Sequence, residues 1–487
     1  MVLQPIPVLL FRSDANSSMG TGHLMRCTAL AEYLAENFIC KLITRCNIEA
    51  LLDVSRSVFS EVYILSEETN ETELLEEKTD QWKLILLDGY GFDNDYQKQL
   101  KLRGFSIAAI DDIIANQAQS DLVLNHCGAL MPSQYKAKPW TVFALGPSYA
   151  LLRKNFLVPK EERRTVINDR NCFICFGGAD PLNDTLSAVK ELTEKKIFTH
   201  LYVIVGAAYK YRDQLQQYIS SQKNISCYQA VDAERMIDIM RQCSYAILSA
   251  SSVVFEYLAL GGIVWVKMIA DNQKYMHRFL INEGLGVAYE SAKISIEEDF
   301  SKMLCNQQQF FDGKYDQRLK KLFASWLFSK RLKIRNAEQR DAHLIWQWAN
   351  DPVVREQSYS SNMIPWNNHI TWFSKKLNDT SCYYYILENE DNSVGQIRFD
   401  IDGENKATLS YLIAPSFRSK GMGAWILSKG IKKLLCDASQ VRKVIGHVKK
   451  INIVSQKSFE KLNFVKGAST AYPDSYTYLM QINEHSN

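Results

Sequence analysis

Short, continuous apolar runs alternate with stretches of helical periodicity over the first 125 residues of the chain. The apolar runs lie at 8–11, 84–88, 107–111 and 122–125. Uninterrupted apolar strands separated by helices are typical of a parallel sheet that helices cover on both faces. Three of the runs end in a polar residue, at the carboxyl edge where such sheets bind their ligands. These polar residues are Asp88, Asp111 and Asn125.

A Gly-Thr-Gly-His loop at 20–23 joins the first apolar run to a helix that we expect to begin near His23. Glycines at such a turn let the backbone approach a ligand, and the free N–H groups of the helix favour an anionic phosphate or carboxylate. Apolar residues of the helix recur at steps of three and four, which predicts an amphipathic helix with one buried stripe. The stripe comprises Leu24, Cys27, Ala31, Leu34 and Phe38.

A second series of apolar strands follows a charged, non-periodic connection at 153–170. Because wound domains commonly hold a ligand in the cleft between them, the sequence predicts two Rossmann-like α/β domains, 1–155 and 156–325, that face a cleft. The strands of the second domain are expected at 172–176, 201–205, 245–248 and 263–266.

The pattern changes after a charged stretch at 314–333. Alternating apolar and polar residues then predict antiparallel strands, so we expect a third domain at 331–487. The alternation is found at 383–387, 394–399 and 407–413.

Composition narrows the function to small-molecule chemistry. The 487 residues have a formal charge of +3, which gives no electrostatic case for nucleic acid or an anionic membrane as partner. No apolar run approaches the roughly 20 residues that span a bilayer, and the N-terminus lacks a signal-peptide pattern. The 11 cysteines show no Cys-x-x-Cys pair and no metal-like spacing. We therefore expect a cytoplasmic protein with reduced thiols, whose oligomeric state stays open.

The second domain carries turns of the same kind as the His23 loop. The segment 176–183, Phe-Gly-Gly-Ala-Asp-Pro-Leu-Asn, lies between a strand and a helix, and 249–252, Ser-Ala-Ser-Ser, ends another strand. Small hydroxyls at a helix start can hold a diphosphate, and a carboxylate one turn later, at Glu256, can accept both hydroxyls of a ribose. These turns indicate a nucleotide or nucleotide-sugar ligand.

In the order and spacing of these segments, residues 8 to 310 resemble the nucleotide-sugar hydrolases of pseudaminic acid biosynthesis, which look like glycosyltransferases of the GT-B architecture. The resemblance implies hydrolysis of UDP-2,4-diacetamido-2,4,6-trideoxy-β-L-altropyranose, with inversion at the anomeric carbon, to UDP and 2,4-diacetamido-2,4,6-trideoxy-L-altrose. The matching segments are Arg12-Ser-Asp14, Gly20-x-Gly22-His23-x-x-Arg26, 145–147, 149–153, 176–183, 249–256 and 271–273.

The roles that the resemblance implies suit the chemistry of the side chains. A neutral imidazole takes a proton from water near pH 7, so we expect His23 to be the base and Asp14 to orient it or to contact the substrate. Helix ends and Arg26 would offset the charge of departing UDP without a metal ion. A turn-capping role for Asp14, a packing role for Tyr90 and a solvated position for Glu256 stay open. The expected substrate contacts are Gly22, Arg26, Tyr90, Gly178, Asn183, Ser251, Ser252, Glu256, Asn272 and Gln273.

A third glycine-rich turn opens a helix in the C-terminal domain. The segment 418–424, Arg-Ser-Lys-Gly-Met-Gly-Ala, offers backbone N–H groups and two cations to a pyrophosphate, which coenzyme A carries. With the segment 452–464 it resembles motifs A and B of GNAT acetyltransferases over residues 331 to 482. The resemblance implies a mixed, largely antiparallel sheet and direct attack of an amine on acetyl-CoA. Cofactor contacts are expected from Ile413, Arg418, Lys420, Gly421, Met422, Gly423, Ala424 and Asn452.

One position departs from the GNAT pattern. Many relatives place a tyrosine there as the acid for the departing thiolate, whereas this chain has Phe459. Ser455, Ser458 or water stay open as proton donors, and the thiolate can also leave unassisted.

Together the two resemblances imply a bifunctional enzyme of pseudaminic acid biosynthesis. Its C-terminal domain would acetylate the C4 amine of a UDP-4-amino sugar, and its first two domains would hydrolyse the product. Two alternatives stay open: a GT-B glycosyltransferase fused to an acetyltransferase, and a nucleotide-sugar sensor without turnover.

Overall fold

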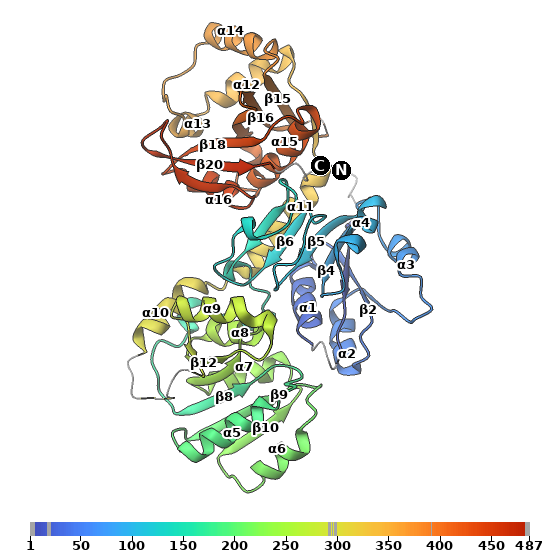
Figure 1. Cartoon of the computed structure of the whole chain (residues 1–487), viewed down its shortest axis with the longest axis vertical. Coiled ribbons are helices and arrows are strands. Elements are labelled where there is room, and N and C mark those ends of the chain that lie inside the picture. The colour runs from blue at the N-terminus through green and yellow to red at the C-terminus, as the bar shows by residue number, and fades with distance from the viewer. Residues whose placement is uncertain are drawn as a thin grey trace. The chain divides into compact units, whose positions relative to one another are not determined.

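The computed structural model describes residues 5–16, 21–290, 294, 296, 300–390 and 392–482. The chain forms two compact units, each described by itself below. Figure 1 labels the helices and strands. The domain boundaries expected from the sequence stay a prediction. Unit 1 comprises Met1–Ala115, Leu124–Leu130 and Leu145–Lys320, and unit 2 comprises Asn116–Val123, Met131–Ala144 and Lys321–Asn487.

The first sheet brings the ends of two buried strands together. β1 (Val8–Ser13) pairs in parallel with both β2 (Ile39–Thr44) and β4 (Leu84–Asp88). The strand order is β3-β2-β1-β4-β5-β6-β7, so the order reverses between β1 and β4, where doubly wound sheets bind ligands. Ser13 and Asp88 are in register at this point. The other strands are β3 (Glu61–Ile64), β5 (Ser106–Ile110), β6 (Leu122–Asn125) and β7 (Val142–Leu145).

The helix α1 (Gly22–Leu34) begins one residue before His23, where the sequence places it. The expected apolar residues are buried, although Phe38 lies beyond the end of the helix, but so are Arg26, Thr28 and Leu30 on its other faces. The prediction of an amphipathic helix is therefore wrong, because β1, β4 and α2 (Glu49–Val58) all pack around α1. The next helices are α3 (Glu71–Lys78) and α4 (Asn94–Leu102).

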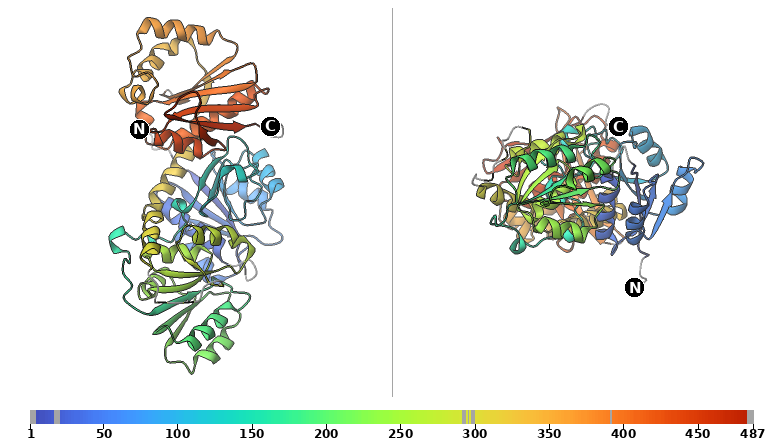
Figure 2. Two further views of the ribbon diagram at one scale, coloured as in Figure 1. Left: turned by 60° about the vertical axis from the view of Figure 1, so that its left-hand side comes forward. Right: turned by 90° about the horizontal axis from the view of Figure 1, so that it is seen from below.

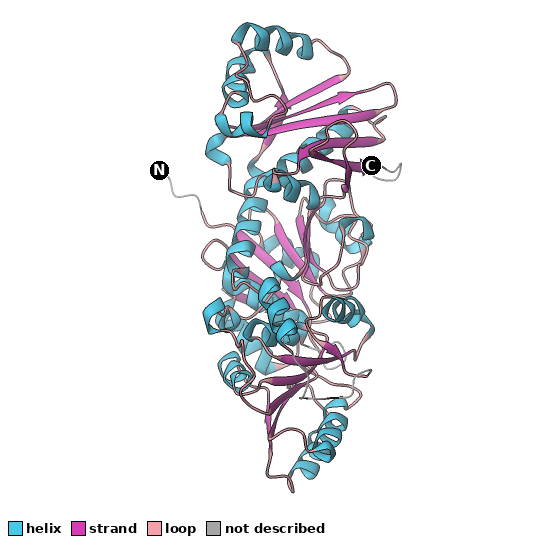
Figure 3. Ribbon diagram, turned by 90° about the vertical axis from the view of Figure 1, so that its left-hand side faces the viewer, coloured by secondary structure: helices cyan, strands magenta, loops and turns pink. Residues whose placement is uncertain are grey.

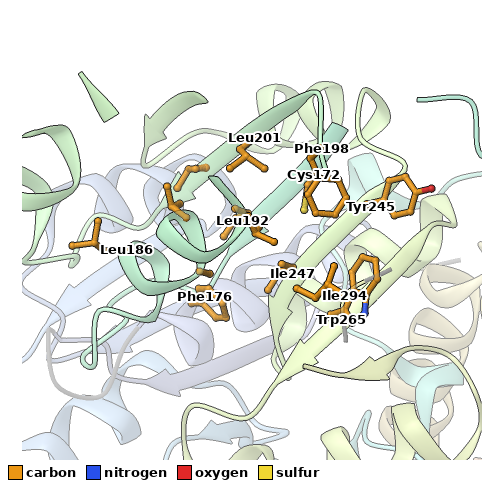
Figure 4. Packing of buried hydrophobic residues seen from close by; sticks show 14 of the residues in the cluster. Cys172, Phe176, Leu186, Leu192, Phe198, Leu201, Tyr245, Ile247, Trp265 and Ile294 are labelled. Carbon is orange, nitrogen blue, oxygen red and sulfur yellow. The ribbon is translucent and has the colours of Figure 1, made fainter. Parts of the chain in front are cut away.

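The second parallel sheet has the order β10-β9-β8-β11-β12-β13, and helices lie on both of its faces (Figure 3). The rings of Phe198, Tyr245 and Trp265 pack in the core of one face (Figure 4). The expected α/β class with parallel sheets is confirmed, whereas a GT-B cleft stays a prediction. The strands are β8 (Asn171–Cys175), β9 (His200–Val205), β10 (Ile225–Gln229), β11 (Tyr245–Ser249), β12 (Ile263–Lys267) and β13 (Val287–Ala288), and the helices are α5 (Asp184–Lys195), α6 (Arg212–Ile219), α7 (Ala233–Arg241), α8 (Ser252–Leu260), α9 (Lys274–Asn282), α10 (Ser301–Phe310) and α11 (Tyr315–Arg331).

Unit 2 contains a mixed sheet in the order β14-β15-β16-β17-β18-β20-β19, as expected, and α15 (Gly423–Asp437) packs against it (Figure 2). β17 (Lys406–Ile413) pairs in parallel with β18 (Lys443–Lys449) only as far as Leu409 and Gly446. Both strands continue beyond this pair, so they separate toward their carboxyl ends. The other elements are β14 (Lys333–Asn336), β15 (Cys382–Asn389), β16 (Asn392–Ile401), β19 (Val465–Ala468), β20 (Ser475–Gln481), α12 (Ala342–Ala349), α13 (Pro352–Gln357), α14 (Trp366–Leu377) and α16 (Ile453–Glu460).

The eleven cysteines are free thiols, of which Cys305 in unit 1 and Cys436 in unit 2 are exposed. Within the described ranges, no helix combines the length and the apolar character that a membrane crossing needs.

Candidate functional site

His23 is held at the start of α1 by the carboxylate that ends β4. Its Nδ1 lies 2.7 Å from Oδ1 of Asp88, and both side chains are buried. An ionised carboxylate only accepts hydrogen bonds, so the contact with Asp88 favours the tautomer with the ring proton on Nδ1, although Nη2 of Arg26 also lies 3.0 Å from this nitrogen. The lone pair of the imidazole then lies on Nε2, the nitrogen that a base would use.

A buried arginine fixes the same carboxylate from the next turn of α1. Arg26 donates from Nε to Oδ2 of Asp88, at 2.6 Å, and from Nη2 to Oδ1, while its Nη1 reaches Asp112 at 3.1 Å. Burial opposes ionisation of Asp88, but the charge of Arg26 and the contact with His23 outweigh it and lower the pKa of the carboxyl. Two carboxylates thus surround one guanidinium, which leaves a net negative charge beside the imidazole.

Tyr90 connects this cluster to the second parallel sheet. Its ring meets the ring of His23 edge-on, with 4.7 Å between centroids, and its hydroxyl donates to Asp112 at 3.3 Å. Asn272 donates to the same hydroxyl at 2.6 Å. Burial and the charge of Asp112 raise the pKa of Tyr90, so the phenol stays protonated. Tyr90 is 43% exposed and can therefore meet a ligand.

The loop before His23 also approaches a turn of the second sheet. A Cβ built on Gly178 would lie 2.4 Å from Oγ1 of Thr21, so only glycine allows this approach. A Cβ built on Gly22 would meet no atom within 4 Å, and Gly20 lies outside the described residues. The two glycine-rich turns expected from the sequence are therefore neighbours in unit 1.

The expected diphosphate turns occupy the carboxyl ends of β8 and β11. Gly177 has a φ of +86°, and the hydroxyls of Ser249 and Ser251 lie 2.9 Å apart, where α8 begins at Ser252. Asn183, with a φ of +57°, accepts from Tyr209 at 2.5 Å. The roles of these residues in binding stay predictions.

Three other expected contacts already have protein partners. Both oxygens of Glu256 accept from the guanidinium of Arg153, at 2.8 and 2.7 Å, in a largely buried pair. Oε1 of Gln273 accepts from the backbone N–H of Ile269. Asp14 accepts from Arg12 and from the backbone N–H of Arg45. A ribose at Glu256 would have to use lone pairs that Arg153 leaves free, and a catalytic role for Asp14 stays a prediction.

In unit 2, the expected pyrophosphate turn lies at the start of α15. Met422 is the last residue before the helix, Gly423 begins it, and Gly421 has a φ of +77°. Arg418 is less available than expected, because its Nη1 donates to Asp351 at 2.8 Å and its Nε to the carbonyl of Ile413. The remaining expected contacts are Lys420, whose ammonium lies 5.0 Å from the Phe417 ring, Ala424, which is buried, and Asn452, which caps α16.

The sequence alone left three residues of these clusters without an assigned role: Asp88, Asp112 and Arg153. Asp88 stood out as a polar residue after an apolar run, and Arg153 lay within a matching segment, but their partners lie 65 and 103 residues away along the chain. Among the described residues, no group of three His, Cys, Asp or Glu side chains is placed to hold a metal ion.

Comparisons with known proteins identify a family for a C-terminal part of the chain and a relative of its N-terminal part. The acetyltransferase (GNAT) domain family matches residues 331–465. A UDP-2,4-diacetamido-2,4,6-trideoxy-β-L-altropyranose hydrolase of Campylobacter jejuni is 30% identical over 290 residues, which are 58% of this chain and 99% of that protein.

Two further relatives are more distant. An uncharacterised protein of Methanocaldococcus jannaschii is 22% identical over 477 residues, covering 93% of this chain and 96% of its own length. The spore coat polysaccharide biosynthesis protein SpsG of Bacillus subtilis is 23% identical over 255 residues, or 51% of this chain and 74% of its own.

Proposed function

Because the chain belongs to the family of the UDP-2,4-diacetamido-2,4,6-trideoxy-β-L-altropyranose hydrolases and also carries a GNAT acetyltransferase domain, we propose that it catalyses two consecutive steps on one UDP-sugar. Unit 2 transfers an acetyl group from acetyl-CoA to the C4 amine of a UDP-4-amino sugar. Unit 1 then hydrolyses the resulting UDP-diacetamido sugar of pseudaminic acid biosynthesis. We also propose that the protein is cytoplasmic.

The observation that most supports the proposed hydrolase activity is the buried contact between His23 and Asp88. Nε2 of His23 takes a proton from a water molecule, whose oxygen attacks the anomeric carbon as the bond to the UDP oxygen breaks. Attack from the side opposite UDP inverts the anomeric configuration. Asp88 and Asp112 together carry one more charge than the guanidinium of Arg26. This excess negative charge stabilises the imidazolium that forms.

UDP binding is assigned to the second parallel sheet. The turn at Gly177 and Gly178 and the first turn of α8 offer backbone N–H groups and serine hydroxyls to the diphosphate. Asn272 donates a hydrogen bond to the hydroxyl of Tyr90 at the edge of the His23 cluster. Both side chains are proposed to contact the sugar.

One incubation tests both activities. The full chain is mixed with the UDP-4-amino sugar and acetyl-CoA and followed by NMR and mass spectrometry. We expect a mass gain of one acetyl group, then release of UDP and of a free sugar with inverted configuration. Transfer of the sugar to an added acceptor in place of water would show a glycosyltransferase, and binding without turnover would show a sensor.

We expect UDP release to be unchanged by excess EDTA. Backbone N–H groups at helix starts supply positive character to the departing diphosphate, so the proposed reaction needs no cation. The rate is measured before and after dialysis against the chelator. Loss of activity that Mg²⁺ or Mn²⁺ restores would contradict the proposal of a metal-independent hydrolase.

A further inference from the structure

The tip of the Phe459 ring is closed off by the backbone of β18. A Cβ built on Gly446 would lie 2.4 Å from Cζ of Phe459 and 2.5 Å from its Cε1. The edge of the Phe459 ring therefore fills the space that a side chain at 446 would take, and it packs directly on the backbone of β18. Phe464 and Tyr478 border the ring on other sides, with centroids at 4.8 and 4.9 Å.

A phenol does lie nearby, on the neighbouring strand. The hydroxyl of Tyr411 lies 3.0 Å from Oγ of Ser455, one turn before Phe459 on α16, and its ring centroid is 6.1 Å from that of Phe459. A Cβ built on Gly423 would lie 3.6 Å from the same hydroxyl and 2.2 Å from Oγ of Ser458. The phenol thus lies between α16 and the first residue of α15.

Tyr411 also occupies the part of β17 that has left its parallel partner. Pairing with β18 ends at Leu409 and Gly446, two residues before Tyr411. Where two parallel strands separate, backbone groups are free to bind a ligand that enters between them. The phenol therefore lies where β17 has separated from β18, beside the turn assigned to the pyrophosphate.

We propose that the hydroxyl of Tyr411, hydrogen-bonded to Ser455, protonates the departing thiolate of coenzyme A. This inference rests on the proposed acetyl transfer. The amine nitrogen forms its bond to the acetyl carbon, the carbon–sulfur bond breaks, and the phenol proton passes to sulfur. The nitrogen loses one proton to water as the amide forms, and the phenolate regains a proton from water through Ser455, so the products are the amide and the free thiol. Because burial raises the pKa of Tyr411, against the effect of its serine partners, the phenol holds its proton at neutral pH.

Tyr411→Phe tests the proposal in the full chain, with acetyl-CoA and the UDP-4-amino sugar. We expect kcat for acetyl transfer to fall by about 10²-fold, the lower end of what a general acid contributes, with KM for acetyl-CoA unchanged. Tyr385→Phe is the matched control, because it also removes a buried phenol hydroxyl, here bonded to Asp437. It is expected to keep the wild-type kcat.

A second variant separates proton transfer from packing. Replacement of Tyr411 by 3,5-difluorotyrosine keeps the ring and the hydroxyl but lowers the phenol pKa. We expect its kcat to decline at an alkaline pH at which the wild type is still active. A pH profile identical to the wild type, or a folded Tyr411→Phe variant with full kcat, would overturn the inference alone. A wild-type protein that transfers no acetyl group would overturn the proposed function together with it.

Discussion

Substitution of His23 by asparagine is expected to lower kcat for UDP release by about 10²–10⁴-fold, the range that general base catalysis contributes. Asparagine can still meet Asp88 but has no nitrogen that accepts a proton near neutral pH. Because UDP is assigned to the second sheet, its affinity should change little. UDP release is measured with a coupled assay and UDP binding by calorimetry.

His200→Asn is the matched control for this variant. His200 lies on β9, and its Nε2 contacts the hydroxyl of Ser226 at 2.9 Å. This substitution should leave both UDP release and UDP binding unchanged. If His23→Asn keeps wild-type kcat, the imidazole is not the base and the proposed mechanism is wrong.

Asp88→Asn is expected to affect both stability and activity. The substitution leaves the guanidinium of Arg26 buried without its main counter-charge, and breaking a buried ion pair in this way costs about 3–5 kcal/mol. The amide can also donate to Nδ1 of His23, which would move the ring proton to Nε2 and remove the lone pair that the base needs. Urea unfolding and UDP release measure the two effects.

The pH dependence of stability provides a further readout for Asp88. Its pKa is lower in the folded protein than in the unfolded chain, so its contribution to stability is present above the unfolded pKa of about 3.9 and is lost as the pH falls through the folded value. The free energy of unfolding of the Asp88→Asn variant should lack this acid-dependent contribution. Asp341→Asn, which breaks another bidentate pair, with Arg335 in unit 2, should destabilise without slowing UDP release. Equal loss of UDP release in both variants would contradict a specific role for Asp88.

Local patterns were enough to predict the position of His23 and most buried strands. The apolar runs at β1, β4, β8 and β11 are continuous because helices cover both faces, and the glycine turn marks where α1 begins. Short strands at the sheet edges, such as β3 and β13, were missed because a four-residue or two-residue strand carries little periodicity.

The partners of the predicted residues could not be found in the same way. His23 and Asp88 meet only because β1 and β4 are neighbours in the sheet, and strand order is not visible in a local pattern. The amphipathic interpretation of α1 failed for a related reason: Arg26 and Thr28 look like solvent-facing residues until their buried partners are known. The pairing of Glu256 with Arg153 likewise depends on two distant segments.

The distribution of thiols gives a direct route to measuring distances within this molecule. Cys305 and Cys436 are exposed, one in each unit, whereas seven of the other nine are buried and two are partly buried. Dyes or nitroxide labels attached at these two thiols would report, by energy transfer or pulsed spin resonance, whether the distance between the two units changes when acetyl-CoA and the proposed UDP-sugar are added.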